Sequence, residues 1–487
     1  MYTGVTARVS HGATCVTCAA GFDDGGAVLG LGDPRKDPDV CRSARRRGHA
    51  HAPALTDLAE LVAIPSVADE RLYPLAECDR AAQWVAAAFR AEGIDDARLQ
   101  PTPDGTSTVV GHRPGPAGSP TVLLYAHYDV QPPLDEAAWV SPPFELTERG
   151  GRYFGRGAAD CKGNIAAILT ALRALRGNDG GYPVGVRIAI EGSEEQGGGG
   201  FEDLVPVRPD LVAADAVLIV DVGNVSLGRP TLTTSLRGSA GLVVRVSTLA
   251  GPVHSGMFGG AAPDPIAALV AILATLRDER GDTTIRGLDG SATWPGAGWD
   301  AEEFRTAAGV LPGVAVLGSG SVADQVWARP VVTVVGIDAP PVVGSTPSIQ
   351  GTASALLNLR IPPGMDPVAA RDALIEHLHA VAPWGAQVTV EATGVGEPFL
   401  ARTDAPGFAV LSGALAEAFG EPTVTVGEGA SIPLCNELAR LLPDAAIMLL
   451  GVEEPEAAIH APNESVHPDE ISGIALALAL FLSRVAA

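Results

Sequence analysis

The chain has 487 residues and a formal net charge of −24, with 33 Lys and Arg against 57 Asp and Glu. This length exceeds one ordinary domain and allows substantial buried cores. The acidic composition argues against nonspecific binding to nucleic acids or to anionic membranes, and it favours solubility.

The first fifty residues differ from the rest of the chain. They contain clusters of Gly, Asp and Arg without a sustained amphipathic period, and no apolar segment follows the arginines at residues 45–47, as a secretory signal would require. We interpret residues 1–50 as a disordered N-terminal extension, or as the product of a start codon assigned too early. The six cysteines are scattered, which is compatible with a reducing cytoplasm, so we expect a cytoplasmic protein.

The first clear helix is expected in ALTDLAELVAIPSV, from residue 54, and three short apolar strands follow it: TVLLYA, VRIAIEG and AVLIV. Such β-branched runs are typical of buried parallel strands. Each is followed by side chains of metal-ligand type, namely His127, Glu194, Glu195 and Asp221. Because ligands of open α/β sheets bind outside the carboxyl ends of the strands, we expect these side chains to share one site.

Two further positions complete the set: Asp160 in GRGAADCKGN and His460 in AIHAPNE. Taken alone, Asp160 could equally be a solvated loop residue or a helix N-cap. Carboxylates and imidazoles together suit a pair of divalent ions such as Zn²⁺ or Mn²⁺ that share a hydrolytic water. The pattern therefore predicts a two-metal hydrolase.

The pattern changes after Asp221. We expect antiparallel strands in TLTTSLRGSAGLVVRVST, a glycine-rich loop in GPVHSGMFGG and an amphipathic helix in PDPIAALVAILATLRDER, followed by a strand in ASALLNLRIP and a helix in DPVAARDALIEHLHAV. The C-terminal IALALALFL is too short for the roughly 20 residues of a membrane-spanning helix, so we interpret it as a packed terminal helix.

From about Asp57 onward the chain resembles the M20 family of metallopeptidases, in particular its dipeptidase branch, which includes the carnosinase-like cytosolic dipeptidases. The motifs that carry the resemblance are H-x-D, G-x-x-D-x-K-G and E-E-x-G, with a later Asp and a late His. It implies an α/β fold, with a mixed-sheet, helix-flanked, two-metal catalytic domain at residues 51–230 and 396–487. An α+β lid and dimerisation domain would be inserted at residues 231–395.

The resemblance also implies how the metals are held. His127 and Asp221 would bind one ion, Glu195 and His460 the other, and Asp160 would bridge both. A shared carboxylate screens the repulsion of two cations roughly 3.5–4 Å apart. The Asp160–Cys161 peptide bond would be cis, as in the family.

Further roles follow from the chemistry and from the same resemblance. Glu194 would be the general base that takes a proton from the metal-activated water and passes it to the departing amine. Asp129 could accept the ring N–H of His127, or be a solvated loop acid. His254 in the H-S-G motif would reach the active site of the neighbouring subunit and support the developing oxyanion.

Two residues are candidates for substrate binding. Arg360 would grip a free carboxylate with two parallel hydrogen bonds, although a lone Arg on a strand is often a surface ion pair. Ser431 in GEGASIP matches a substrate-contacting serine of the family.

We therefore expect a homodimeric metal-dependent dipeptidase, with two divalent ions, Zn²⁺ first and Mn²⁺ or Co²⁺ as alternatives. It would bind small peptides or N-acyl amino acids as substrates, and we expect it to bind neither nucleic acids nor membranes. Alternative functions are a deacylase of N-acetyl or N-succinyl amino acids, or an inactive binding or scaffold relative, although no ligand and no base is lost. ATGVGEPFLA lacks the His that carnosinase-like members carry there, which argues against a strict preference for His-containing dipeptides.

Overall fold

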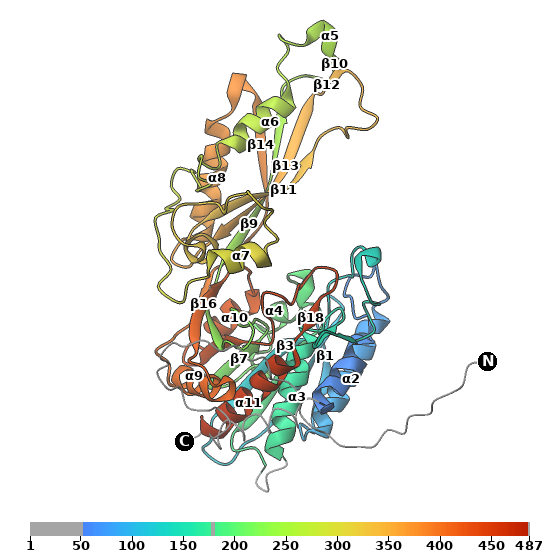
Figure 1. The fold of residues 1–487 in the computed structure, drawn as a ribbon, viewed down its shortest axis with the longest axis vertical. Helices are drawn as coiled ribbons and strands as arrows, with labels where there is room; N and C mark the ends of the chain where they lie inside the picture. The colour runs from blue at the N-terminus through green and yellow to red at the C-terminus, as the bar shows by residue number, and fades with distance from the viewer. Residues whose placement is uncertain (1–51, 177–180, 486–487) are drawn as a thin grey trace, which may run out of the picture. The chain divides into compact units, whose positions relative to one another are not determined.

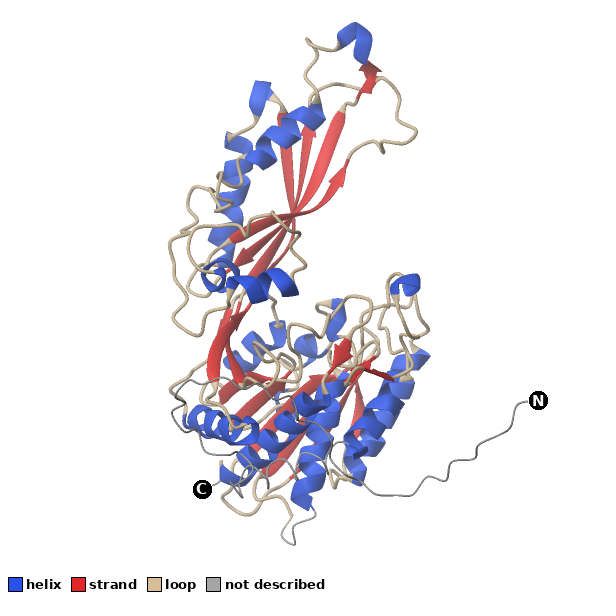
Figure 2. Cartoon of the chain, in the orientation of Figure 1, coloured by secondary structure: helices blue, strands red, loops and turns tan. Residues whose placement is uncertain are grey.

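The computed structural model describes residues 52–176 and 181–485. The predicted N-terminal extension, residues 1–50, lies outside the described residues. Residues 52–62 are helical, as expected from ALTDLAELVAIPSV. Figure 2 shows strands covered by helices in an α/β arrangement, and the expected fold class is confirmed.

The main sheet carries the strands that were expected to hold the site. Its order is β1 (Arg98–Pro101), β2 (Ser107–Arg113), β6 (Gly185–Glu191), β3 (Thr121–His127), β7 (Ala216–Val220), β17 (Ala446–Leu450), β8 (Thr231–Leu236) and β15 (Phe399–Leu400), and β16 (Val424–Glu428) pairs with β8. Strands β6, β3, β7 and β17 are parallel, whereas β2 runs antiparallel to β6 and β8 runs antiparallel to β17 and β15 but parallel to β16. The carboxyl ends of the parallel strands therefore share one edge.

Helices cover both faces of this sheet (Figure 1). One face packs against α2 (Ala76–Ala91), α3 (Lys162–Arg176), α9 (Pro406–Phe419) and α11 (Pro468–Arg484), and the other against α4 (Phe201–Leu204) and α10 (Pro433–Leu441). The predicted C-terminal helix is α11, and most of its apolar residues are buried. Within the described ranges, no helix is long and apolar enough to cross a membrane.

A second, antiparallel sheet has the order β11 (Val331–Asp338), β13 (Thr352–Ile361), β9 (Gly238–Ser247) and β14 (Gln387–Gly396). Helices α6 (Pro265–Ala274) and α8 (Pro367–Ala380) pack on it and close a core of its own. The strand expected in ASALLNLRIP and the helix expected from residue 366 are present as β13 and α8.

The structure differs from the expectations at two points of this region. Strand β8 pairs with β17, β15 and β16 in the main sheet, so we place the start of the proposed inserted domain after β8 rather than at residue 231. Helix α6 ends at Ala274, although its pattern continues to residue 280, because Arg277 forms a bridge with Thr283 and donates to the carbonyl of Val332.

The remaining elements are short. A ribbon of β10 (Val253–His254) and β12 (Ser348–Ile349) carries the helical turn α5 (Ser255–Phe258), and α7 (Ala301–Ala307) lies between α6 and β11 along the chain. Strands β18 (Ser465–Val466), β5 (Arg152–Phe154) and β4 (Thr147–Arg149) form a small antiparallel sheet.

Candidate metal centre

The predicted ligands lie where the parallel strands end. His127 is the last residue of β3, and Asp221 follows β7. Glu194 and Glu195 stand in the 3₁₀ turn η3 (Glu194–Gln196) after β6. Asp160 precedes α3 by two residues, and His460 belongs to the loop before β18.

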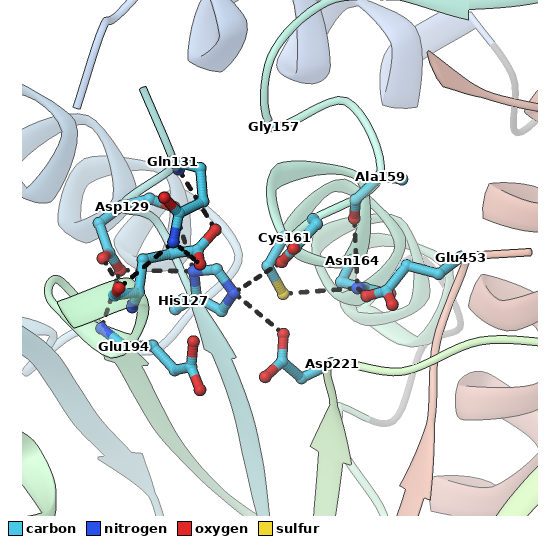
Figure 3. A network of polar contacts seen from close by, with 12 residues as sticks. His127, Asp129, Gln131, Gly157, Ala159, Cys161, Asn164, Glu194, Asp221 and Glu453 are labelled. Carbon is cyan, nitrogen blue, oxygen red and sulfur yellow. Dashed lines mark hydrogen bonds and ion pairs between the residues drawn. The ribbon is translucent and has the colours of Figure 1, made fainter. Parts of the chain in front are cut away.

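A first ligand group forms around His127. Its Nε2 lies 3.0 Å from Asp221 Oδ1 (Figure 3) and 2.9 Å from Asp160 Oδ1. All three side chains are buried. Cys161 adjoins this group, but its Sγ donates to the carbonyl of Val220 at 3.2 Å.

A second ligand group forms around His460. Its Nε2 lies 2.9 Å from Asp160 Oδ2 and 3.2 Å from Glu195 Oε2. Each oxygen of Asp160 therefore faces a different histidine, which is the arrangement that a bridging carboxylate needs. The Asp160–Cys161 peptide bond is cis, as the family resemblance implied.

Asp129 supports the site in a way that its sequence position did not reveal. Its Oδ1 and Oδ2 accept the backbone N–H groups of Glu194 and Glu195, each at 3.1 Å. His127 Nδ1 lies 3.0 Å from the backbone carbonyl oxygen of Asp129 and 3.4 Å from its Oδ1. Asp129 therefore orients the expected base and one expected ligand as well as the imidazole.

Burial dominates the electrostatics of the carboxylates after β6. Burial raises the pKa of Glu194 well above its usual range, and the charge of Asp221 raises it further. Burial also raises the pKa of Glu195, with Asp160 as the next cause. Cations bound nearby would oppose these shifts and favour the ionised carboxylates.

Hydrogen bonds between His460 and Asp160 shift the pKa of each group in the direction that favours its charged form. Hydrogen bonds with Asp160 and Glu195 raise the pKa of His460 to about 11. For Asp160, burial raises the pKa, but hydrogen bonds with His127 and His460 outweigh it and lower the pKa. A bound divalent cation would take the place of the imidazole protons in these pairs, because histidine binds a metal as the neutral imidazole. The donor set of imidazole nitrogens and carboxylate oxygens therefore fits two such ions.

Glu464 is a positioning residue that the motifs did not identify. Its carboxylate accepts the backbone N–H groups of Gly157, Ala159 and Asp160 at 2.9, 3.0 and 3.1 Å. It also pairs with Arg156 at 2.7 Å, and both side chains are fully buried. Because Glu464 lies four residues after His460, it ties the loop of one expected ligand to the loop of the bridging acid.

Glu453 is a further acid that the sequence reasoning missed. One of its carboxylate oxygens falls within 4.8 Å of ligand atoms of Asp160 and Asp221. Figure 3 shows Glu453 beside Asn164. Burial raises its pKa well above the usual range, with Asp160 as the next cause. The signal was available, because Glu453 follows the apolar strand β17 as the other acids follow β6 and β7.

The other predicted residues are not part of this cluster. His254 is exposed in the β10–β12 ribbon, and its Nδ1 accepts the N–H of Gly256 at 3.1 Å. Arg360 lies on β13, where the charge of Glu428 acts on it. Ser431 donates its hydroxyl hydrogen to the carbonyl of Arg237, and the segment that follows it, residues 432–434, lines the cavity that contains Glu194.

Residues 123–484 match the model of Peptidase family M20/M25/M40. The chain belongs to this family. It is a metal-dependent dipeptidase of the family, as the motifs predicted, and the deacylase and scaffold alternatives are not favoured.

Relatives of known name agree with this assignment. The chain is 46% identical, over 83% of its length and 89% of the relative, to the cysteinylglycine-S-conjugate dipeptidase of Corynebacterium striatum. It is 27% identical to the β-Ala-His dipeptidase of Rattus norvegicus, over 80% of this chain and 82% of the relative. The structure of human carnosine dipeptidase 1 superposes with a TM-score of 0.77 at 25% identity, covering 91% of this chain and 99% of that chain.

Proposed function

We propose that this protein is a dinuclear dipeptidase that hydrolyses cysteinylglycine-type dipeptides carrying an apolar substituent on the cysteine sulfur. The observation that carries the hydrolytic chemistry is the position of Asp160, whose two carboxylate oxygens face two separate ligand groups next to Glu194. The relative from Corynebacterium striatum supports the choice of substrate class. We propose Zn²⁺ as the metal, with Mn²⁺ or Co²⁺ as alternatives.

The residues of the chain divide the chemistry between them. His127, Asp221, Glu195 and His460 would hold two cations, with Asp160 between them. When bound, such cations polarise the scissile carbonyl and lower the pKa of the attacking water. Glu194 takes the proton of this water and delivers it to the departing amine.

An aromatic cavity beside the ligands supports an apolar substituent on the substrate. The cavity has a volume of about 480 Å³, and its wall includes Trp299, Trp327, Val426 and Ile459. The rings of Trp299 and Trp327 stack with their centroids 6.1 Å apart. Because Ile459 directly precedes His460, a side chain placed in this cavity would lie next to the proposed metal centre.

A homodimer is the second part of the proposal. Val334, Val335 and Ile337 expose apolar side chains on β11, an edge strand of the second sheet, and exposed apolar surface of this kind favours association. His254 lies in an exposed ribbon together with the exposed Met257. We propose that this ribbon brings His254 to the active site of a second copy.

Mixing variants tests the shared site. His254→Ala and Glu194→Gln should each be inactive, and heterodimers formed after subunit exchange should regain one intact site. Absence of activity after proven exchange, or a fully active monomer, would contradict a role for His254 in the partner.

The cellular location is also a proposal. Cys78, Cys161 and Cys435 are buried free thiols, which supports the reducing cytoplasm that the scattered cysteines suggested.

A substrate panel tests the proposed specificity. With Zn²⁺ supplied, kcat/KM should be higher for S-benzyl-Cys-Gly than for Cys-Gly or β-Ala-His, and N-acetyl amino acids should not be cleaved. Trp299→Ala should reduce this preference, whereas Trp384→Ala, at a tryptophan that is 66% exposed, should not. Faster cleavage of N-acyl amino acids than of dipeptides would contradict the proposal.

A further inference from the structure

Glu470 is a buried acid to which the proposed mechanism assigns no role. It lies in the first turn of α11, and its side chain is fully buried. Its hydrogen-bond partners are neutral: the side-chain amide of Asn224 donates to Oε2 at 2.5 Å, and the backbone N–H of Gly228 donates to Oε1 at 2.6 Å. Burying a carboxyl group among neutral partners is costly, so its position calls for an explanation.

Both partners of Glu470 belong to the loop between β7 and β8, residues 222–230. The amide of Asn224 has a fixed orientation, because its Oδ1 accepts the backbone N–H of Thr231 at 2.8 Å and its Nδ2 must therefore face Glu470. The backbone N–H of Asn224 donates to the carbonyl of Glu453 at 2.7 Å. The buried acid of α11 thus holds a loop that is also attached to β8 and to the segment after β17.

The same loop forms part of the wall of the aromatic cavity. Residues 223–225 line this cavity together with Trp299 and Trp327. Val225 packs against the apolar cluster that contains Trp327 and Val426. Because the loop and the two indole rings line the same space, the position of the loop decides how much room a bound substituent finds there.

The loop approaches the segment after β17 so closely that only glycine fits. Gly223 forms a β-bridge with Glu453, and a Cβ at this glycine would lie 1.9 Å from the carbonyl oxygen of Glu453. The expected ligand Asp221 is held separately, because its backbone N–H donates to the carbonyl of Leu450 at 3.1 Å where β7 pairs with β17. A change at Glu470 should therefore move the cavity wall and leave the ligand in place.

We propose that Glu470 and Asn224 are positioning residues for substrate specificity: their hydrogen bond fixes the cavity wall against which the substituent on the cysteine sulfur packs. The inference rests on the proposed function and deepens it. A binding site discriminates between ligands only while its walls are held by packing and by hydrogen bonds behind them, and a shift of about 1 Å is enough to weaken it.

Reversing the direction of this hydrogen bond tests the proposal. Glu470→Gln turns an NH₂ group toward the NH₂ group of Asn224, since the oxygen of the new amide is needed by the N–H of Gly228. Asn224→Asp places two carboxyl groups face to face. The double variant again pairs an amide with a carboxylate, in the opposite direction and with the same total charge. Each single variant should lose the pair, and the double variant should restore it.

The expected effect is a loss of discrimination. With Zn²⁺ supplied, the ratio of kcat/KM for S-benzyl-Cys-Gly to that for Ala-Gly should fall about 10-fold in each single variant, the scale of one buried group left without its partner. It should recover in the double variant. The fall should lie in KM for S-benzyl-Cys-Gly, while kcat for Ala-Gly and the metal content stay unchanged.

Glu376→Gln is the matched control, because Glu376 is exposed on α8, and it should keep the ratio of the wild type. Equal losses for both dipeptides in the single variants would make Glu470 a purely structural residue and overturn the proposal. Failure of the double variant to recover the ratio would overturn it as well.

Binding to Glu194→Gln, measured by calorimetry, separates this proposal from the proposed function. A preference of this variant for S-benzyl-Cys-Gly over Ala-Gly, lost when Glu470→Gln is added and regained when Asn224→Asp is added as well, supports the proposal even if the wild type cleaves neither dipeptide. A preference that survives Glu470→Gln would overturn it even if both dipeptides are cleaved.

Discussion

Replacing Glu464 by Gln should lower both the free energy of unfolding of the protein and its affinity for Zn²⁺. The substitution leaves Arg156, which is 1% exposed, without its partner. Removing one member of a buried pair costs about 3–5 kcal/mol, because the other charge stays buried. The new amide would also turn an N–H group toward Gly157, whose backbone N–H now donates to the carboxylate, and an orphaned donor costs about 1–3 kcal/mol. We expect a loss of about 4 kcal/mol or more.

Urea unfolding in chelator, and again after saturation with Zn²⁺, measures this loss. Glu417→Gln is the matched control: Glu417 pairs with Arg484 at 2.6 Å, but both side chains are about half exposed, and such pairs contribute about 0–1 kcal/mol. Arg156→Met combined with Glu464→Gln should recover part of the stability, because no charge is then left unpaired. Zn²⁺ should bind more weakly to Glu464→Gln than to the wild type. An unfolding midpoint for Glu464→Gln close to that of Glu417→Gln would refute the reasoning.

Three further predictions concern the metals and the buried acids. Chelation should abolish hydrolysis, and added Zn²⁺ or Mn²⁺ should restore it. The variant Glu194→Gln should keep its metal and lose roughly 10²–10⁴-fold in kcat. Near-wild-type turnover of this variant would mean that another residue is the general base. Asp160→Ala should lose both ions and His460→Ala chiefly one, as elemental analysis of the purified variants will count. Burial raises the pKa of Glu191 and of Glu470 to about 7. Their contribution to stability is therefore complete below about pH 4.5 and declines as the pH rises through 7, so the melting temperature of chelated protein should fall over this range, and a flat profile would contradict it.

The local sequence patterns were sufficient to predict the strands that carry the site. TVLLYA, VRIAIEG and AVLIV became β3, β6 and β7, because buried parallel strands have near-continuous apolar runs. The position of a polar residue at the end of such a run then places it at the shared edge of the sheet. His127 and Asp221 lie together for this reason.

Local patterns failed where distant segments compete for the same strand or helix. Strand β8 alternates like its continuation β9, yet it pairs with β17 and β16 in the main sheet. Helix α6 ends early because Arg277 finds partners far along the chain. Neither the strand pairing of β8 nor the hydrogen bond of Arg277 can be predicted from the local sequence.

The sequence by itself determined the family, the strands β3, β6 and β7, and the metal-type side chains that were predicted at their ends, since these depend on residue identity and on short-range periodicity. The tertiary structure alone decided which polar groups support the site. Glu464 reaches the loop of Asp160 across about three hundred residues of chain, and Asp129 accepts the backbone of η3. Desolvation and pairing are properties of the packed chain, so no local pattern encodes them.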